Sequence, residues 1–197
     1  MEVNDRIVEV QTYKGITTGI FLTHDISEAN LLRSAILSEI ETYTIDTVVF
    51  HVNTSSRHDE IIALRLGQLV LDHSRLEVDD NVDYKIHIDV QGPSEFTTDD
   101  IPELPFRLKT PIATLKAGQR IVCDVFLKKG QGKQHVKWRP VSTVTLREHP
   151  RGYLISFKSI GMLWPPDIFE YGYNKMADAA RRPPITLFSH PLVPENI

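Results

Sequence analysis

One apolar-periodic stretch near the amino terminus, residues 27–40 (SEANLLRSAILSEI), most constrains how this chain can fold. Wound at 3.6 residues per turn, it forms an apolar stripe. The stripe consists of Ala29, Leu32, Ile36 and Ile40, widened by Leu31 and Ala35. A helix that covers a single core needs an apolar arc of about 100°. Because this arc is wider, the pattern predicts a helix that also contacts something beyond its own domain; a fully buried core helix is the alternative.

The composition describes an ordinary soluble, globular chain of 197 residues with a formal net charge of −4, so it provides no general positive field for nucleic acid. The single cysteine, Cys123, excludes an internal disulfide and a cysteine-based zinc or iron–sulfur cluster. The first residues are charged rather than apolar, and no run approaches the roughly 20 apolar residues of a membrane span. We therefore expect an intracellular protein with no membrane contact, located in the cytoplasm, nucleus or virion according to its source.

The first half of the chain alternates strands and helices. Short β-branched segments at 7–13 and 17–23, separated by Lys14-Gly15, predict a hairpin. Asp25, with Glu28 three residues later, predicts an N-cap with a capping box, and we expect the helix to end near residues 42–44. Further elements are a strand at 46–53 and a short helix at 59–67 with Gly67 as a C-cap glycine.

The second half is mostly strands, turns and prolines until its end. The alternating patterns predict strands at 84–90, 119–127, 141–147 and 153–158. His149-Pro150-Arg151-Gly152 is interpreted as a break between domains. A final helix is expected from Pro166 to about Arg182, with Phe169 and Tyr173 on its apolar face.

The two ends of the chain resemble each other in content, and the middle differs from both. Residues 1–52 and 153–197 contain strands and the two long helices, whereas residues 53–152 are mostly strand and turn. This distribution predicts an α+β fold, in which a discontinuous domain of antiparallel strands and two helices carries a mostly β insert.

The sequence contains no recognisable catalytic or metal site. The run Gly130-Gln131-Gly132-Lys133 lacks the flanking residues of a phosphate-binding loop, and the eight histidines are scattered. His51, within a strand, is interpreted as a structural histidine with a hydrogen-bond partner. Paired carboxylates are adjacent in sequence and so do not face each other, which makes them poor acid–base pairs. We predict no catalytic residue, no metal and no cofactor; a hydrolase has no set of residues to support it.

The loop at residues 128–139 (KKGQGKQHVKWR) carries five Lys or Arg residues, no acid, and Trp138. Such a loop can contact phosphates and stack on bases, which gives the alternative that the chain is a stand-alone nucleic-acid-binding module. A solvated loop, or one docked on an acidic protein partner with Trp138 as anchor, explains the same residues.

Taken together, several blocks of sequence resemble the assembly-platform subunits of multisubunit RNA polymerases: the archaeal D-type subunit, the third-largest eukaryotic subunit and the bacterial alpha amino-terminal domain. The blocks, in order, are Asn30-Leu31-Leu32-Arg33 with 36–40, Thr44-Ile45-Asp46, Asn53-Thr54-Ser55, 59–63, Arg65-Leu66-Gly67, 115–119, the residues Gly130, Gly132-Lys133, His135, Lys137-Trp138 and Pro140, then Gly161 and Pro165-Pro166-Asp167. They cover nearly the whole chain.

The resemblance implies a non-catalytic assembly subunit. Residues 1–52 and 153–197 would form a dimerisation domain, and residues 53–152 an insert domain. The chain would pair with a smaller alpha-like subunit, and the pair would bind the second-largest catalytic subunit beside a small zinc-bearing subunit, with DNA contacted only indirectly. The implied dimer interface is Leu32, Ala35, Ile36, Ile40, Phe169 and Tyr173. The implied contacts to larger subunits are Arg33, Arg65, Lys133, His135, Lys137 and Trp138.

Two departures from the family pattern limit which members of the family this chain resembles. Bacterial alpha has a second arginine where this chain has Ser34, and many relatives carry a cysteine cluster that a chain with only Cys123 lacks. The compact form fits a bare archaeal-type subunit or one encoded by a large DNA virus; the loosely matching helix favours the viral interpretation.

Overall fold

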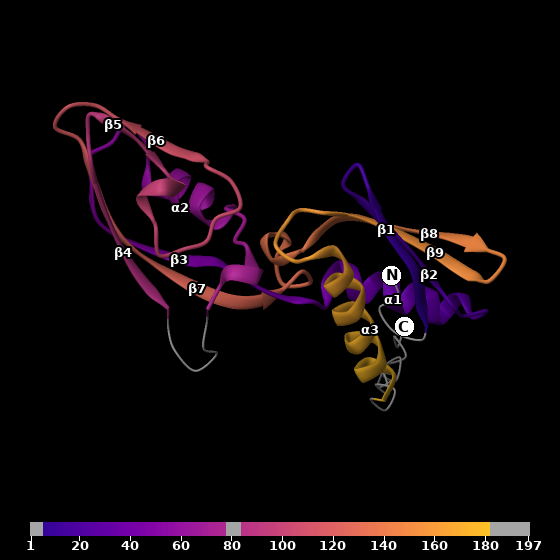
Figure 1. Cartoon of the computed structure of the whole chain (residues 1–197). Coiled ribbons are helices and arrows are strands. Elements are labelled where there is room, and N and C mark those ends of the chain that lie inside the picture. The colour runs from indigo at the N-terminus through magenta and orange to yellow at the C-terminus, as the bar shows by residue number, and fades with distance from the viewer. Residues whose placement is uncertain (1–5, 78–83, 182–197) are drawn as a thin grey trace, which may run out of the picture.

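The computed structural model describes residues 6–77 and 84–181, which form two lobes side by side (Figure 1). The first lobe contains β1 (Ile7–Tyr13), β2 (Ile16–Phe21), α1 (Ile26–Ser38), β8 (Val141–His149), β9 (Gly152–Ser159) and α3 (Pro165–Arg181). The second contains β3 (Glu41–Asn53), α2 (Asp59–Gly67), β4 (Lys85–Gln91), β5 (Ser94–Thr97), β6 (Pro111–Leu115) and β7 (Arg120–Gln131). Three short 3-10 helices are η1 (His73–Arg75), η2 (Thr98–Asp100) and η3 (Val136–Trp138). The predicted α+β class is confirmed.

The first lobe is one antiparallel sheet in the order β1-β2-β9-β8, with α1 and α3 packed on one of its faces. The predicted hairpin is present: Tyr13 pairs with Ile16 across Lys14 and Gly15, whose φ angles are 49° and 77°. Positive φ at both turn residues matches the right-handed twist of the strands, which explains the glycine. A Cβ at Gly172 of α3 would lie 2.5 Å from Ile36, so the two helices approach closely there.

Asp25 caps α1 as predicted, because its carboxylate accepts a hydrogen bond from the Ser27 N–H at 2.8 Å. The reciprocal half of the capping box is not formed. Glu28 instead accepts hydrogen bonds from Arg6 and Thr23. These contacts tie the start of α1 to the residue before β1 and to the segment after β2.

The predicted end of α1 near residues 42–44 is wrong, since the helix ends at Ser38 and β3 begins at Glu41. Tertiary pairing decides this boundary. Glu41 pairs with Gln131 of β7, and the Thr42 hydroxyl donates to the Trp138 carbonyl at 2.7 Å. Helical periodicity carries no information about such distant partners.

The second lobe is built on a sheet in the order β3-β7-β4, with α2 and the β5–β6 hairpin enclosing a core on one side. Ile121, Cys123 and Val125 of β7 point into that core, as their alternation predicts. The helix α2 has the predicted bounds. Gly67 is its last residue rather than a cap, and Gln68 follows in a right-handed helical conformation.

The sheets divide the chain at points other than those expected. The hairpin β8–β9 pairs His149 with Gly152, so the break expected there is a turn within one sheet. Val141 of β8 belongs to the first core, and Ile45 of β3 belongs to the second. The sequence pattern assigns most of β3 to the first lobe, but β3 belongs to the sheet of the second. It assigns β8 to the second lobe, but β8 belongs to the sheet of the first. The division into two domains remains a prediction, with its boundaries now placed near residues 40 and 140.

Candidate functional site: the junction of the two lobes

The junction between the lobes is held by η3, which packs against the adjoining ends of β3 and β7. Trp138 is buried, and its indole N–H donates to the Lys128 carbonyl at 3.2 Å. A Cβ on Gly130 would come within 2.4 Å of that indole, so only glycine fits beneath the ring. His135 caps η3 by accepting from the Lys137 N–H. These contacts explain structurally why glycine and tryptophan occupy those positions.

The lysines of the loop 128–139 are engaged within the chain. Lys137 Nζ lies 2.6 Å from Asp46 Oδ1 and 3.3 Å from the Ile45 carbonyl, and its side chain is only 13% exposed. Lys133 Nζ lies 2.6 Å from Glu39 Oε2 at the end of α1. Lys128 and Lys129 are each 3.9 Å from an acid, Asp46 and Glu41 respectively. These four lysines share three acids, so the positive charge of the loop is partly compensated within the chain.

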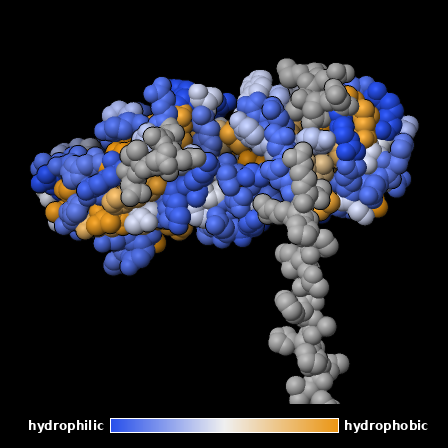
Figure 2. All heavy atoms as spheres, turned by 90° about the horizontal axis from the view of Figure 1, so that it is seen from below, coloured by the Kyte–Doolittle hydropathy of each residue, from blue (hydrophilic) through white to orange (hydrophobic). Residues whose placement is uncertain are grey.

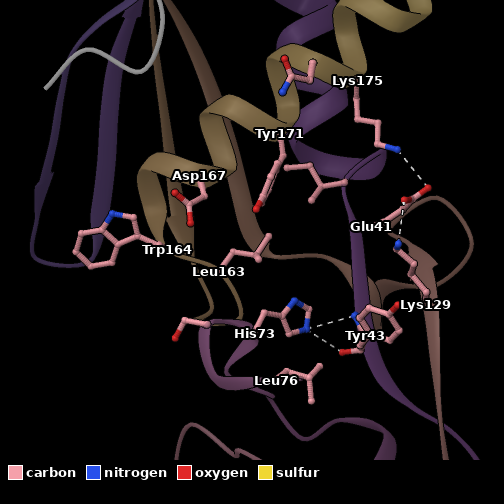
Figure 3. A pocket seen from close by; sticks show the side chains of 13 residues that line it. Glu41, Tyr43, His73, Leu76, Lys129, Leu163, Trp164, Asp167, Tyr171 and Lys175 are labelled. Carbon is pink, nitrogen blue, oxygen red and sulfur yellow. Dashed lines mark hydrogen bonds and ion pairs between the residues drawn. The ribbon is translucent and has the colours of Figure 1, made fainter. Parts of the chain in front are cut away.

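A groove crosses the junction between η1, β3 and the first half of α3 (Figure 3). His73 joins the lobes at its base: its backbone N–H donates to the Met162 carbonyl, and its Nε2 lies 3.1 Å from the Tyr43 carbonyl. Burial lowers the pKa of His73 to about 4. A neutral imidazole is therefore part of the folded junction at neutral pH.

A second polar cluster occupies the outer face of the sheet β3-β7-β4. The carboxylate of Asp124 lies 2.8 Å from Lys85 Nζ, His51 Nε2 and His87 Nδ1. Hydrogen bonds from these three groups hold the pKa of Asp124 well below its usual range. His51 is thus a histidine with a hydrogen-bond partner, as predicted.

The residues expected at a dimer interface lie inside the first lobe. Leu32, Ile36 and Phe169 are fully buried in its core, Ala35 and Ile40 nearly so, and Tyr173 is half-buried against the same core. The structure therefore brings all six together within the chain. The side chains that α1 presents outward are their neighbours Ile26 and Leu31, 48% and 49% exposed.

The residues expected to contact larger subunits are not brought to one surface. Arg65 donates to the Ile112 carbonyl at 2.7 Å, and Arg33 donates to Asn30 of its own helix. Lys133, Lys137 and Trp138 hold the junction, as described above. His135 is exposed beside Val136, which is also exposed.

Sequence reasoning missed two aromatic side chains at the groove, Trp164 and Tyr171. Trp164 immediately precedes α3, and Tyr171 lies seven residues later on the same helical face (Figure 3). An aromatic residue on the polar side of an amphipathic helix was the available signal. Among residues 6–77 and 84–181 no group of three His, Cys, Asp or Glu side chains could hold a metal ion. In the same part of the chain no helix has the length and apolar character needed to cross a membrane.

Comparison with known proteins gives consistent similarities. No family model matches the chain. It is 36% identical over 126 residues to "DNA-directed RNA polymerase subunit Rpo3" of Pyrococcus furiosus, covering 58% of this chain and 48% of that protein. It is 32% identical over 123 residues to the protein of the same name from Methanocaldococcus jannaschii, covering 60% of this chain and 63% of the relative.

A eukaryotic relative shows the same similarity. The chain is 31% identical over 162 residues to "DNA-directed RNA polymerase II subunit rpb3" of Dictyostelium discoideum, covering 64% of this chain and 52% of that protein. The chain thus spans about half to two thirds of the length of these curated relatives.

Proposed function

We propose that this chain, which belongs to the family of RNA polymerase subunits named Rpo3 in archaea and subunit 3 in eukaryotes, is a non-catalytic assembly subunit of a DNA-directed RNA polymerase. It pairs with a smaller alpha-like subunit, and the pair docks on the second-largest catalytic subunit with a small zinc-bearing subunit beside it. The names of the relatives support the proposal that the chain is a subunit of a DNA-directed RNA polymerase. The pairing is argued from the surface of α1.

The proposed pairing rests on the apolar side chains that α1 exposes on its outward face. Ile26 and Leu31 are large apolar side chains, yet both are about half exposed. The remaining outward positions on this helix are small or polar, with exposed Ser27 and Ser34. A helix with apolar residues on its solvent side and small residues beside them can be covered closely by a partner helix. The interface is thus expected to lie on Ile26 and Leu31, with the six buried residues supporting the helix from behind.

Docking on a catalytic subunit is supported by the surface of α2 in the other lobe. Ile61 and Leu64 are exposed on this helix, and Leu64 borders a hollow that Leu69 and Pro111 also line. Figure 2 shows one face of the molecule, on which apolar residues gather in separate patches over both lobes among hydrophilic residues. Separate apolar surfaces on the two lobes suit a subunit that meets two partners.

The experiment is co-expression with the small alpha-like subunit of the same genome, using two aspartate variants. Leu31→Asp places a charge on the outward face of α1 and is expected to abolish the complex, because pairing would bury an unpaired carboxylate. Leu64→Asp is the matched control, since it makes the same change on an exposed leucine of the other lobe and should pair normally. Normal pairing by Leu31→Asp contradicts the proposed interface. Circular dichroism checks that both variants are folded.

No observation on the loop 128–139 favours the alternative that the chain is a stand-alone nucleic-acid-binding module. Its lysines, Lys128, Lys129, Lys133 and Lys137, lie near acids of the same chain, and Trp138 is buried. Stacking on bases requires an exposed aromatic ring. We therefore do not propose it.

A further inference from the structure

The groove at the junction continues beyond the hollow described above. One hollow, of about 390 Å³, lies between α3, η1 and β3. A second, of about 520 Å³, extends toward the β1–β2 turn. The two share Ser74, Leu163 and Trp164 in their walls, so they adjoin at Trp164, and we call them together the groove.

Apolar and aromatic side chains along this groove lie open to solvent. Trp164 is 62% exposed and Tyr171 is 44% exposed, although both line the first hollow. Leu108 and Ile160 are exposed in the second hollow. The backbone of Trp164 is held at the start of α3, because its carbonyl accepts from the Ile168 N–H at 3.2 Å. Exposed aromatic side chains that line a hollow are typical of a binding surface.

Among the described residues, the groove walls hold three acids (Glu41, Asp72 and Asp167) and three cations (Lys129, Lys175 and Arg107), so the groove as a whole has no excess of either charge. Glu41 lies near both Lys129 and Lys175, and Asp72 is paired with Arg107. Asp167 faces the first hollow, yet among the described residues no cation or hydrogen-bond donor pairs with its carboxylate. Figure 3 shows this carboxylate on the edge of α3 that carries Trp164 and Tyr171. An acid in the first turn also favours the helix dipole, so its contribution to binding must be separated from its contribution to stability.

We propose that this groove binds an extended, basic segment of a partner protein. An arginine or lysine of that segment lies against Trp164 and Tyr171 and pairs with Asp167, while apolar neighbours fill the hollow beside Leu108 and Ile160. Aromatic faces attract cations, and a guanidinium forms charge-assisted hydrogen bonds with a carboxylate. A carboxylate in place of that arginine or lysine would be repelled by Asp167.

This surface is separate from the outward face of α1, so the inference does not depend on the proposed pairing. It predicts binding by the isolated chain of 197 residues. The probe is a labelled octapeptide that contains two arginines, each with a leucine on either side. Its matched controls replace both arginines by glutamine or by glutamate. Fluorescence anisotropy measures the dissociation constants at low ionic strength and at a temperature where every variant is folded.

The arginine peptide is expected to bind at least tenfold more tightly than the glutamine peptide, and the glutamate peptide is expected not to bind. Asp167→Asn should weaken the arginine peptide about tenfold, and Trp164→Ala should weaken it further. Asp178→Asn is the charge control on α3, about 16 Å along the helix. Val49→Ala is the apolar control, because Val49 is exposed on β3 of the other lobe. Neither control should change the affinity.

Three results would overturn the proposal. Equal binding of all three peptides would mean that the groove recognises apolar content alone. An unchanged affinity in Asp167→Asn would remove the carboxylate from recognition. Self-association of the chain that is lost in Trp164→Ala would identify a second copy as the occupant.

Discussion

The indole of Trp138 covers Gly130 so closely that the smallest side chain would overlap it, at 2.4 Å from a Cβ. Gly130 is on β7 and Trp138 on η3, so this contact fixes the turn between them and, through Thr42, the start of β3. The junction of the two lobes is therefore a packed structure rather than a flexible linker.

Gly130→Ala should destabilise the protein by about 1–3 kcal/mol, because the new methyl group must displace a buried indole. Urea denaturation followed by tryptophan fluorescence measures the change. Gly67→Ala is the matched control: it lies in α2, and its nearest neighbour is 3.4 Å from the added Cβ. That change should be neutral or slightly stabilising, since alanine favours a helix. Equal stability of the two variants would refute the packing argument.

Two lysines of the same loop should differ in their effect on stability. Lys137→Met should cost about 1–3 kcal/mol, because it leaves the partly buried Asp46 carboxylate without its close partner. Lys133→Met removes a pair that is exposed, with side chains 50% and 36% accessible, and should change stability by less than about 1 kcal/mol. Thermal unfolding at low salt compares the two variants. A larger loss in Lys133→Met would reverse the assignment.

Stability should fall as the pH falls from about 6.5 toward 4, and His73 is the cause. Burial lowers its folded-state pKa to about 4, so in this range the unfolded chain binds a proton that the folded chain does not. Protonation thus favours unfolding, by about 3 kcal/mol over the full window. His73→Gln should remove this part of the pH dependence, which urea titrations at several pH values measure. An unchanged slope in that variant would show that His73 is not the responsible group.

A separate loss is expected at lower pH from Asp124. Its pKa is depressed in the folded protein by Lys85, His87 and His51, so its stabilising contribution is present above the unfolded-state pKa near 4. That contribution disappears as the pH falls below this value. Asp124→Asn should therefore flatten the profile below pH 4 and leave the His73 window unchanged.

Local patterns predicted the elements that depend on local interactions. The turn at Lys14-Gly15, the Asp25 cap and the bounds of α2 follow from residues close together in sequence. The end of α1 and the lobe to which β8 belongs depend on pairing between distant segments. Proline and glycine at residues 150–152 mark a turn equally well within a sheet or between domains.

The candidate site shows the same limit. Periodicity identified the apolar positions of α1 but could not distinguish those facing the chain's own core, such as Ile36, from those facing outward, such as Leu31. Charge counting identified a basic loop but could not reveal that Glu39, Glu41 and Asp46, far away in sequence, lie beside its lysines.

The most direct test of the central proposal is the mass of the purified chain by light scattering, alone and with the small alpha-like subunit of the same genome. The account predicts a stable one-to-one complex whose mass does not change with dilution to submicromolar concentration. A chain that remains a well-behaved monomer in the presence of that subunit would contradict it.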